Sequence, residues 1–231
     1  MPIPMMCSYC GERIATDNEH VFPRNLYPTS KAQSRVQRLT IPSCQDCNKG
    51  WSDDEAHFRN VLALAGEPNE ARRELWETTI RRSFKKSDGA RRWRDLVESM
   101  RPVEINGETR HKVYPGQDDR VIRIVKKIVR GLCHHHRVMS AVSERRVWVD
   151  VLKYSIPEEF LSQMTYEHRE HDIAEYQYQV LCESGIHSAW LITFFQRVTF
   201  IGMVSQSEDG SFPEKTGQQA HPGGRGLRPR H

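Results

Sequence analysis

Apolar residues recur at helical spacing in two parts of the chain. In the first part, which runs from Cys44 to about Ala65, the apolar stripe consists of Trp51, Phe58, Val61, Leu62 and Ala65. This periodicity predicts one continuous helix. Asn48, Ser52 and Glu55 are spaced at i, i+4 and i+7, so we expect them to share another face of that helix.

The second helical pattern covers residues 119–133. Its apolar positions are Val121, Ile124, Val125, Ile128, Val129 and Leu132. The opposite positions are basic, namely Arg120, Arg123, Lys126, Lys127 and Arg130. The pattern predicts a helix whose apolar face packs on a sheet. We expect its basic face to be solvated, with contact to nucleic acid as the alternative.

Strand-like runs follow this helix. They lie at 147–152, 176–182 and 190–204, and the last run is long enough for two strands that turn near Gln196 and Arg197. A short helix over 157–164 is expected between the first two runs. Earlier in the chain, Asn106-Gly107 between two β-prone segments is typical of a hairpin turn.

These elements predict an α+β fold in four parts. Residues 1–66 form a small module, 67–101 a basic helical connector, and 102–205 an α+β domain with a largely antiparallel sheet. Residues 206–231 are rich in Gly, Pro, Gln and Ser without periodicity, and we expect a disordered tail. Within the module, residues 13–22 are expected to form a short hairpin and 23–40 an irregular loop.

Composition limits the cellular setting. The chain has 231 residues, a net charge of +4 and a hydrophobic fraction of 37%. It has no long apolar run, and the start MPIPMMC lacks the features of a signal peptide. We therefore expect a cytoplasmic protein without a membrane partner.

The positive charge is concentrated in residues 71–101, which carry ten Lys or Arg against five Asp or Glu. Trp76, Phe84 and Trp93 are interleaved with these charges, a composition suited to a phosphate backbone. The candidate nucleic-acid contacts are Arg81, Arg82, Lys85, Lys86, Arg91 and Arg92. The alternative is a pair of solvated amphipathic helices whose aromatic residues are core.

Two CxxC pairs carry the strongest chemical signal. Cys7 and Cys10 form the first pair, and Cys44 and Cys47 the second. A two-residue spacer lets both thiolates of a pair bind one ion, so the four predict a structural zinc site. The alternatives are unrelated buried cysteines or two disulfides. Cys133 and Cys182 are expected in the core.

Between the pairs lies Glu19-His20-Val21-Phe22-Pro23, and Asn48 follows the second pair directly. Over residues 7 to about 60 this arrangement resembles the HNH, or ββα-metal, nuclease superfamily, and especially phage junction-resolving endonucleases. The resemblance implies a hairpin with an acid-His pair, followed by a helix that carries an Asn ligand. The superfamily's central Asn has no counterpart in residues 37–42.

The resemblance implies a metal-dependent endonuclease that hydrolyses DNA phosphodiester bonds. His20 would be the general base. Glu19 and Asn48 would bind a catalytic Mg²⁺ or Mn²⁺, with Glu55 as a further ligand and Ser52 a weaker candidate. DNA is the expected partner, RNA is left open, and cutting both strands would favour a homodimer.

Two other functions are carried as alternatives. The absent central Asn favours a zinc-scaffolded nucleic-acid-binding protein without catalysis. The protein could also be an interaction domain whose zinc site simply joins the N-terminus to the α+β domain. Separately, the alternative for Glu19-His20 is an ordinary polar hairpin step. Of the remaining histidines, His134, His135 and His136 lack acidic partners at ligand spacing, and His168 and His171 are expected on a surface helix.

Overall fold

The computed structural model describes residues 4–31, 36–65, 69–105, 107–170 and 172–212. The protein is a mixed α+β structure built around a five-stranded antiparallel sheet. None of the helices in these described ranges combines the length and apolar character that crossing a membrane requires.

The sheet has the strand order β5-β9-β8-β7-β6. Its strands are β5 (Val147–Val151), β6 (Thr165–Glu170), β7 (Ala174–Glu183), β8 (Ile186–Phe194) and β9 (Val198–Ser205). The three predicted runs are therefore strands, and the last run is indeed two. A short helix, α7 (Glu158–Leu161), follows β5 as expected.

Strand β6 was not predicted. His168, expected on a surface helix, lies in β6 instead, because this polar segment pairs along the edge of β7. His171 lies outside the described residues. Edge strands often carry charged side chains that prevent pairing with other chains, so their apolar pattern is weak.

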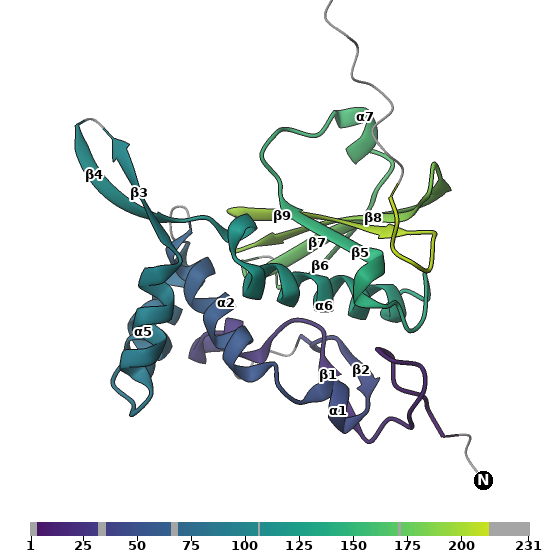
Figure 1. Cartoon of the computed structure of the whole chain (residues 1–231), viewed down its shortest axis with the longest axis horizontal. Helices are drawn as coiled ribbons and strands as arrows, with labels where there is room; N and C mark the ends of the chain where they lie inside the picture. Colours follow the sequence, from purple (N-terminus) through teal and green to yellow (C-terminus); the bar gives the residue numbers. More distant parts are fainter. Residues whose placement is uncertain (1–3, 32–35, 66–68, 106, 171, 213–231) are drawn as a thin grey trace, which may run out of the picture.

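Helix α6 (Asp119–His135) covers one face of the sheet (Figure 1). All six of its predicted apolar positions are buried. The helix and β9 approach closely, because a Cβ on Gly202 would lie 2.9 Å from Cγ2 of Val129. The predicted packing of this helix on a sheet is confirmed.

The basic face of α6 is only partly solvated, which corrects the expectation of a solvated face: Arg123 is exposed, whereas Lys127 is fully buried. The helix lies against the N-terminal unit, which we define as the described residues between 4 and 65 (Figure 1). A Cβ on Gly131 would lie 3.2 Å from Val21 and 3.4 Å from Ile41. Arg130 donates to the carbonyls of Tyr9 (3.0 Å) and Val142 (2.6 Å). One hydrophobic core consequently runs from the N-terminal unit through α6 to the sheet.

In the N-terminal unit, β1 (Asp17–His20) pairs with β2 (Thr40–Ser43). The hairpin expected within residues 13–22 is absent, and Ile14 instead forms an isolated bridge with Met6. After β1 the chain turns into the core, where Val21 and Leu26 are fully buried. The intervening loop includes two short 3-10 helices, η1 (Arg24–Leu26) and η2 (Thr29–Lys31).

The single helix expected from Cys44 to Ala65 is two helices, α1 (Gln45–Asn48) and α2 (Ser52–Leu64). The break falls at Gly50, whose φ of +87° is favoured by glycine. Asn48 therefore does not share a helix face with Ser52 and Glu55, which corrects that prediction. The buried stripe of α2, with Phe58, Val61 and Leu62, is as predicted.

The connector is helical, as predicted. It consists of α3 (Glu70–Leu75), the π-helical segment η3 (Trp76–Ile80), α4 (Arg81–Ser83) and α5 (Gly89–Glu98). Its aromatic residues contact one another, with Phe84 6.4 Å from Trp76 and 5.3 Å from Trp93 between ring centroids.

The predicted hairpin follows α5 and extends away from the rest of the molecule (Figure 1). It pairs β3 (Met100–Ile105) with β4 (Glu108–Val113). Two further 3-10 helices, η4 (Pro115–Gln117) and η5 (Glu144–Arg146), precede α6 and β5. Of the tail expected to be disordered, the structure describes 206–212, and the remainder lies outside the described residues.

Candidate metal centre and active site

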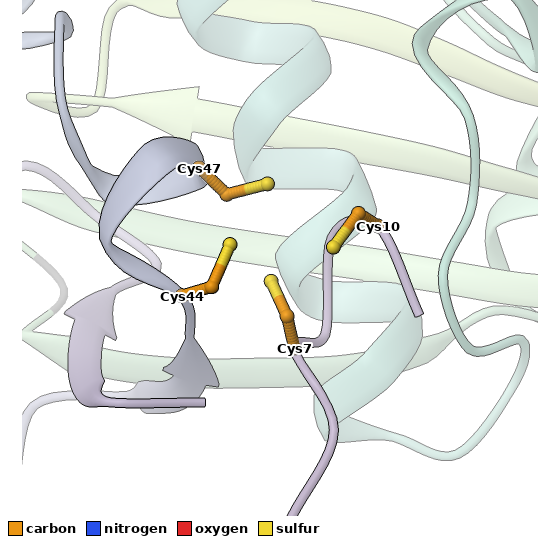
Figure 2. A group of neighbouring side chains, drawn as sticks. All are labelled: Cys7, Cys10, Cys44 and Cys47. Atoms are coloured by element: carbon orange, nitrogen blue, oxygen red, sulfur yellow. The ribbon is translucent and has the colours of Figure 1, made fainter. Parts of the chain in front are cut away.

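The four cysteines of the CxxC pairs meet at one point (Figure 2). Their Sγ atoms all lie within 4.8 Å of one another, and all four are free thiols. The first pair is presented by a turn in which the amide of Gly11 donates to Cys7 (2.9 Å), and the second lies at the start of α1. Neither two disulfides nor unrelated buried cysteines describes this arrangement.

The cluster suits a tetrahedral thiolate-bound metal. Zinc–sulfur bonds of about 2.3 Å place the sulfurs of a tetrahedral site about 3.8 Å apart. Burial raises the pKa of Cys7, but backbone amides of Cys44, Cys10 and Tyr9 lower it to about 6. Burial and the neighbouring thiols raise the pKa of Cys47. The four cysteines are positioned to bind a metal ion, and the donor set is consistent with structural zinc.

Glu19 and Glu55 lie close to each other, but both form an ion pair with a lysine. The Nζ atom of Lys127, on α6, forms an ion pair with Glu19 and a second ion pair with Glu55 at 2.8 Å. The Lys127 side chain has no exposed surface, and those of Glu19 and Glu55 are 13% and 17% exposed. Burial raises the pKa of Glu19, although Lys127 opposes the rise. Sequence reasoning missed Lys127 because it placed the basic face of α6 in solvent.

Asn48 has a different partner. Its Nδ2 atom donates to the carboxylate of Asp17 at 3.1 Å. Both residues line an open hollow of about 480 Å³ together with Thr16, Gln45 and Lys49. Asp17 was not predicted as a site residue. Its position two residues before Glu19, on the same face of a strand, is the signal that could have identified it.

His20 ends β1 and is half-buried. Its Nδ1 atom is buried and has no hydrogen-bond partner among the residues that the structure describes. Burial lowers the pKa of His20, and the positive charges of Arg24, Arg38 and Lys127 lower it further. The imidazole is therefore held neutral near several cations, as a general base at neutral pH requires.

Glu19, Asn48 and Glu55, the residues expected to bind a catalytic cation, are not arranged to bind one ion together. Glu19 and Glu55 are engaged by Lys127, whereas Asn48 is engaged by Asp17. Among the described residues, the four cysteines are the only group of three or more Cys, His, Asp or Glu side chains close enough to share an ion. The structure thus divides the expected cation ligands into two separate sets of contacts.

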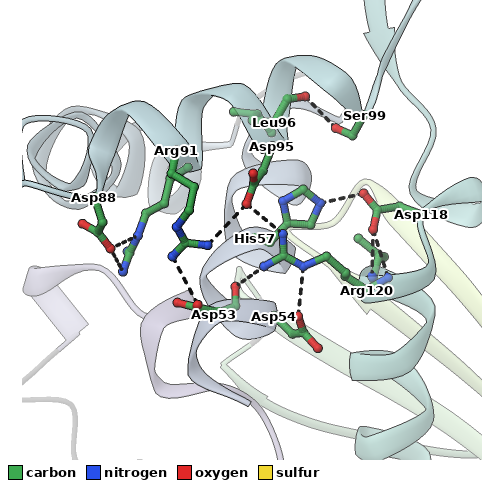
Figure 3. Close-up of polar contacts among 12 residues, drawn as sticks. Asp53, Asp54, His57, Asp88, Arg91, Asp95, Leu96, Ser99, Asp118 and Arg120 are labelled. Carbon is green, nitrogen blue, oxygen red and sulfur yellow. Dashed lines mark hydrogen bonds and ion pairs between the residues drawn. The ribbon is translucent and has the colours of Figure 1, made fainter. Parts of the chain in front are cut away.

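A network of charged side chains joins α2, α5 and α6 (Figure 3). Arg120 contacts Asp54 at 2.9 Å and Asp95 at 3.1 Å. His57 contacts Asp118 at 2.6 Å, and both side chains are nearly buried. Burial raises the pKa of Asp118, but the contact with His57 and two backbone amides bring it below its ordinary value. No sequence motif indicated this network.

The cations proposed for nucleic-acid contact fall into two classes. Arg91 is paired with Asp53 (3.2 Å), and Arg92 with Asp88 (2.7 Å). Four others are exposed and have no carboxylate partner in the described part of the chain, namely Arg81, Arg82, Lys85 and Lys86. These four flank Phe84 on and after α4.

The remaining histidine and cysteine candidates contact residues of the α6–sheet part of the molecule or are exposed on it. His136 contacts the hydroxyl of Tyr176 at 2.9 Å and packs against Tyr178. Cys133 is buried, as expected, but Cys182 is exposed on β7 and does not belong to the core. The positive φ of Cys182 (+52°) marks an irregularity in the pairing of β7 with β8, which turns this residue outward.

Comparison with known proteins gave no relative from which a role could be transferred. No protein-family model, curated protein or solved structure matches the chain. The assignment of function rests on the geometry above.

Proposed function

We propose that the N-terminal unit is an endonuclease that hydrolyses phosphodiester bonds in DNA, with His20 as the general base. One observation carries this proposal. His20 ends the first strand of a β1–β2–α1 unit held at a four-cysteine cluster, its buried Nδ1 lacks a partner among the described residues, and burial and nearby positive charge lower its pKa.

The chemistry follows from charge and protonation. Hydrolysis needs a water molecule to lose a proton as it attacks phosphorus, and a neutral imidazole can take that proton. Arg24 and Arg38, whose charges lower the pKa of His20, are the cations that would stabilise the negative charge of the transition state. The four thiolates would hold zinc, which fixes the fold of the unit.

The resemblance assigns a catalytic Mg²⁺ or Mn²⁺ to Glu19, Asn48 and Glu55. Because the structure divides these residues between Lys127 and Asp17, we derive no step of the reaction through that cation. The general-base role of His20 stands independently of it.

DNA contact is proposed for the exposed cations around α4. Arg81, Arg82, Lys85 and Lys86 carry charges that no carboxylate of the described residues neutralises. Such charges bind the phosphate backbone without reading sequence. Arg91 and Arg92 are assigned instead to the ion pairs of α5.

A nicking assay tests the nuclease proposal. Zinc-loaded wild type would be incubated with supercoiled plasmid without added cation, with Mg²⁺ and with Mn²⁺, beside His20→Ala and His187→Ala. His187 is a matched control, because it is also half-buried, its Nδ1 also lacks a partner, and burial also lowers its pKa. We expect nicking by wild type and His187→Ala but not by His20→Ala.

A non-catalytic nucleic-acid-binding protein is the second candidate. The ion pairs of Lys127 with Glu19 and Glu55 favour it, because they engage two residues that the nuclease resemblance assigns to catalysis. This candidate predicts DNA binding by a folded wild type that does not nick under any of the three conditions.

A further inference from the structure

Lys127 is buried, although its position on the basic face of α6 predicts an exposed side chain. It belongs to the basic face of α6, and its neighbour Lys126 is only partly buried. The Lys127 side chain instead has no exposed surface. A lysine is almost never fully buried without partners, because removing its charge from water is costly.

Two carboxylates and one aromatic ring compensate that burial. Nζ of Lys127 contacts Glu19 from β1 and Glu55 from α2, at 2.8 Å from the latter. It also lies 5.1 Å from the centroid of the Trp51 ring. These partners come from β1, from α2 and from the residue that precedes α2, whereas the lysine comes from the helix that covers the sheet.

We propose that the ammonium group of Lys127 takes the place of a divalent cation between Glu19 and Glu55. This inference rests on the proposed function, which identifies that position as part of a nuclease site. In this chain the positive charge beside His20 is supplied by a side chain of α6, and Glu19 and Glu55 are closed to metal ions as long as Lys127 is present.

The distances show that a divalent cation would fit in the position of the ammonium group with little movement of the carboxylates. Carboxylate oxygens bind Mg²⁺ at about 2.1 Å and Ca²⁺ at about 2.3–2.6 Å. The oxygens that now contact Nζ would need to move by less than about 1 Å to bind such an ion. Removing the ammonium group would leave two partly buried carboxylates facing each other, an arrangement that attracts a divalent cation.

Manganese binding to the zinc-loaded full chain tests the inference, with free Mn²⁺ measured by electron paramagnetic resonance. Lys127→Ala is the opening variant. Lys126→Ala is its matched control, because it removes the same charge one position away on the same helix. We expect Lys127→Ala to bind one Mn²⁺ at least tenfold more tightly than wild type and Lys126→Ala, and adding Glu55→Gln to Lys127→Ala to remove that gain.

The wild-type arm decides the inference even if Lys127→Ala does not fold. Wild type, Glu19→Gln and Glu55→Gln should bind Mn²⁺ with the same affinity, because neither glutamate is open to the ion. A wild type that binds Mn²⁺ tightly and loses it in Glu19→Gln would overturn the inference, as would a folded Lys127→Ala without any gain. Neither result depends on nicking, so the proposal for Lys127 can be contradicted while the proposal for His20 stands, and the reverse.

Discussion

Asp118 illustrates how a single residue connects α2 of the N-terminal unit with α6. Its carboxylate accepts hydrogen bonds from the amides of Arg120 and Val121 at the start of α6 and also contacts His57 of α2. The sequence around Asp118 indicates only a helix start. The partner 61 residues earlier in the chain depends on tertiary packing.

Asp118→Asn should therefore destabilise the protein in a pH-dependent way. The pKa of Asp118 is lowered in the folded protein, so its charge contributes stability above its ordinary pKa of about 3.9 and loses it as the pH falls through the lowered value. Asparagine still caps the helix, so we expect a loss of about 1–3 kcal/mol at pH 7.

Urea unfolding at pH 7, 5 and 3 measures this loss. The difference between wild type and Asp118→Asn should be largest at pH 7 and smaller at pH 3. Asp119→Asn, an exposed neighbour, is the control and should change little. A difference that is equal at all three pH values would show that the charge of Asp118 is not responsible.

At the scale of elements, long periodic segments and the hairpin with a strong turn signal were predictable, whereas β1, β6 and the break before α2 were not. The helix from Asp119 to His135 and the strands β5, β8 and β9 follow from apolar periodicity. Strand β1 has only four residues and pairs across a long loop, so no local pattern indicates its partner. The break at Gly50 was also missed, because an isolated glycine inside a helical pattern is often tolerated.

The connector contains two pairs of consecutive arginines that differ in their surroundings. Arg81 and Arg82 are exposed and have no carboxylate partner among the described residues, whereas Arg91 and Arg92 are paired with acids. Arg81→Gln with Arg82→Gln should weaken DNA binding and lower the slope of log K against log salt by about two, at about 0.9 per phosphate contact.

Fluorescence anisotropy with labelled duplex DNA at several salt concentrations measures that slope. The control, Arg91→Gln with Arg92→Gln, removes the same charge and should change the slope less. Equal changes for both double variants would mean that overall charge, and not the exposed surface at α4, determines binding.

For the whole molecule, the position of α6 is the main feature that sequence reasoning missed. The sequence predicts a solvated basic face for α6, because charge usually indicates contact with solvent. In the structure it forms the boundary with the N-terminal unit, through Lys127, Arg130 and the small residue Gly131. The four cysteines were predictable as one group because metal-binding spacing is specific, and the structure confirms that they meet.

The shared core predicts one cooperative unfolding transition for the N-terminal unit and the sheet. Removing the metal should therefore lower the midpoint of the entire transition, by about 10 °C or more, because metal binding contributes several kcal/mol to folding. Differential scanning calorimetry of the zinc-loaded and metal-free chain measures this. Two transitions, only one of which responds to zinc, would show that the two parts unfold independently.

The central claim is that His20 acts as a general base in DNA cleavage. The most direct measurement is the initial nicking rate of supercoiled plasmid by wild type, His20→Ala and His187→Ala at equal zinc content. Because a positioned general base contributes about 10²–10⁴ in rate, we predict a loss of at least about 100-fold for His20→Ala alone. A rate for His20→Ala equal to that of wild type, or no nicking by folded wild type, would contradict the claim.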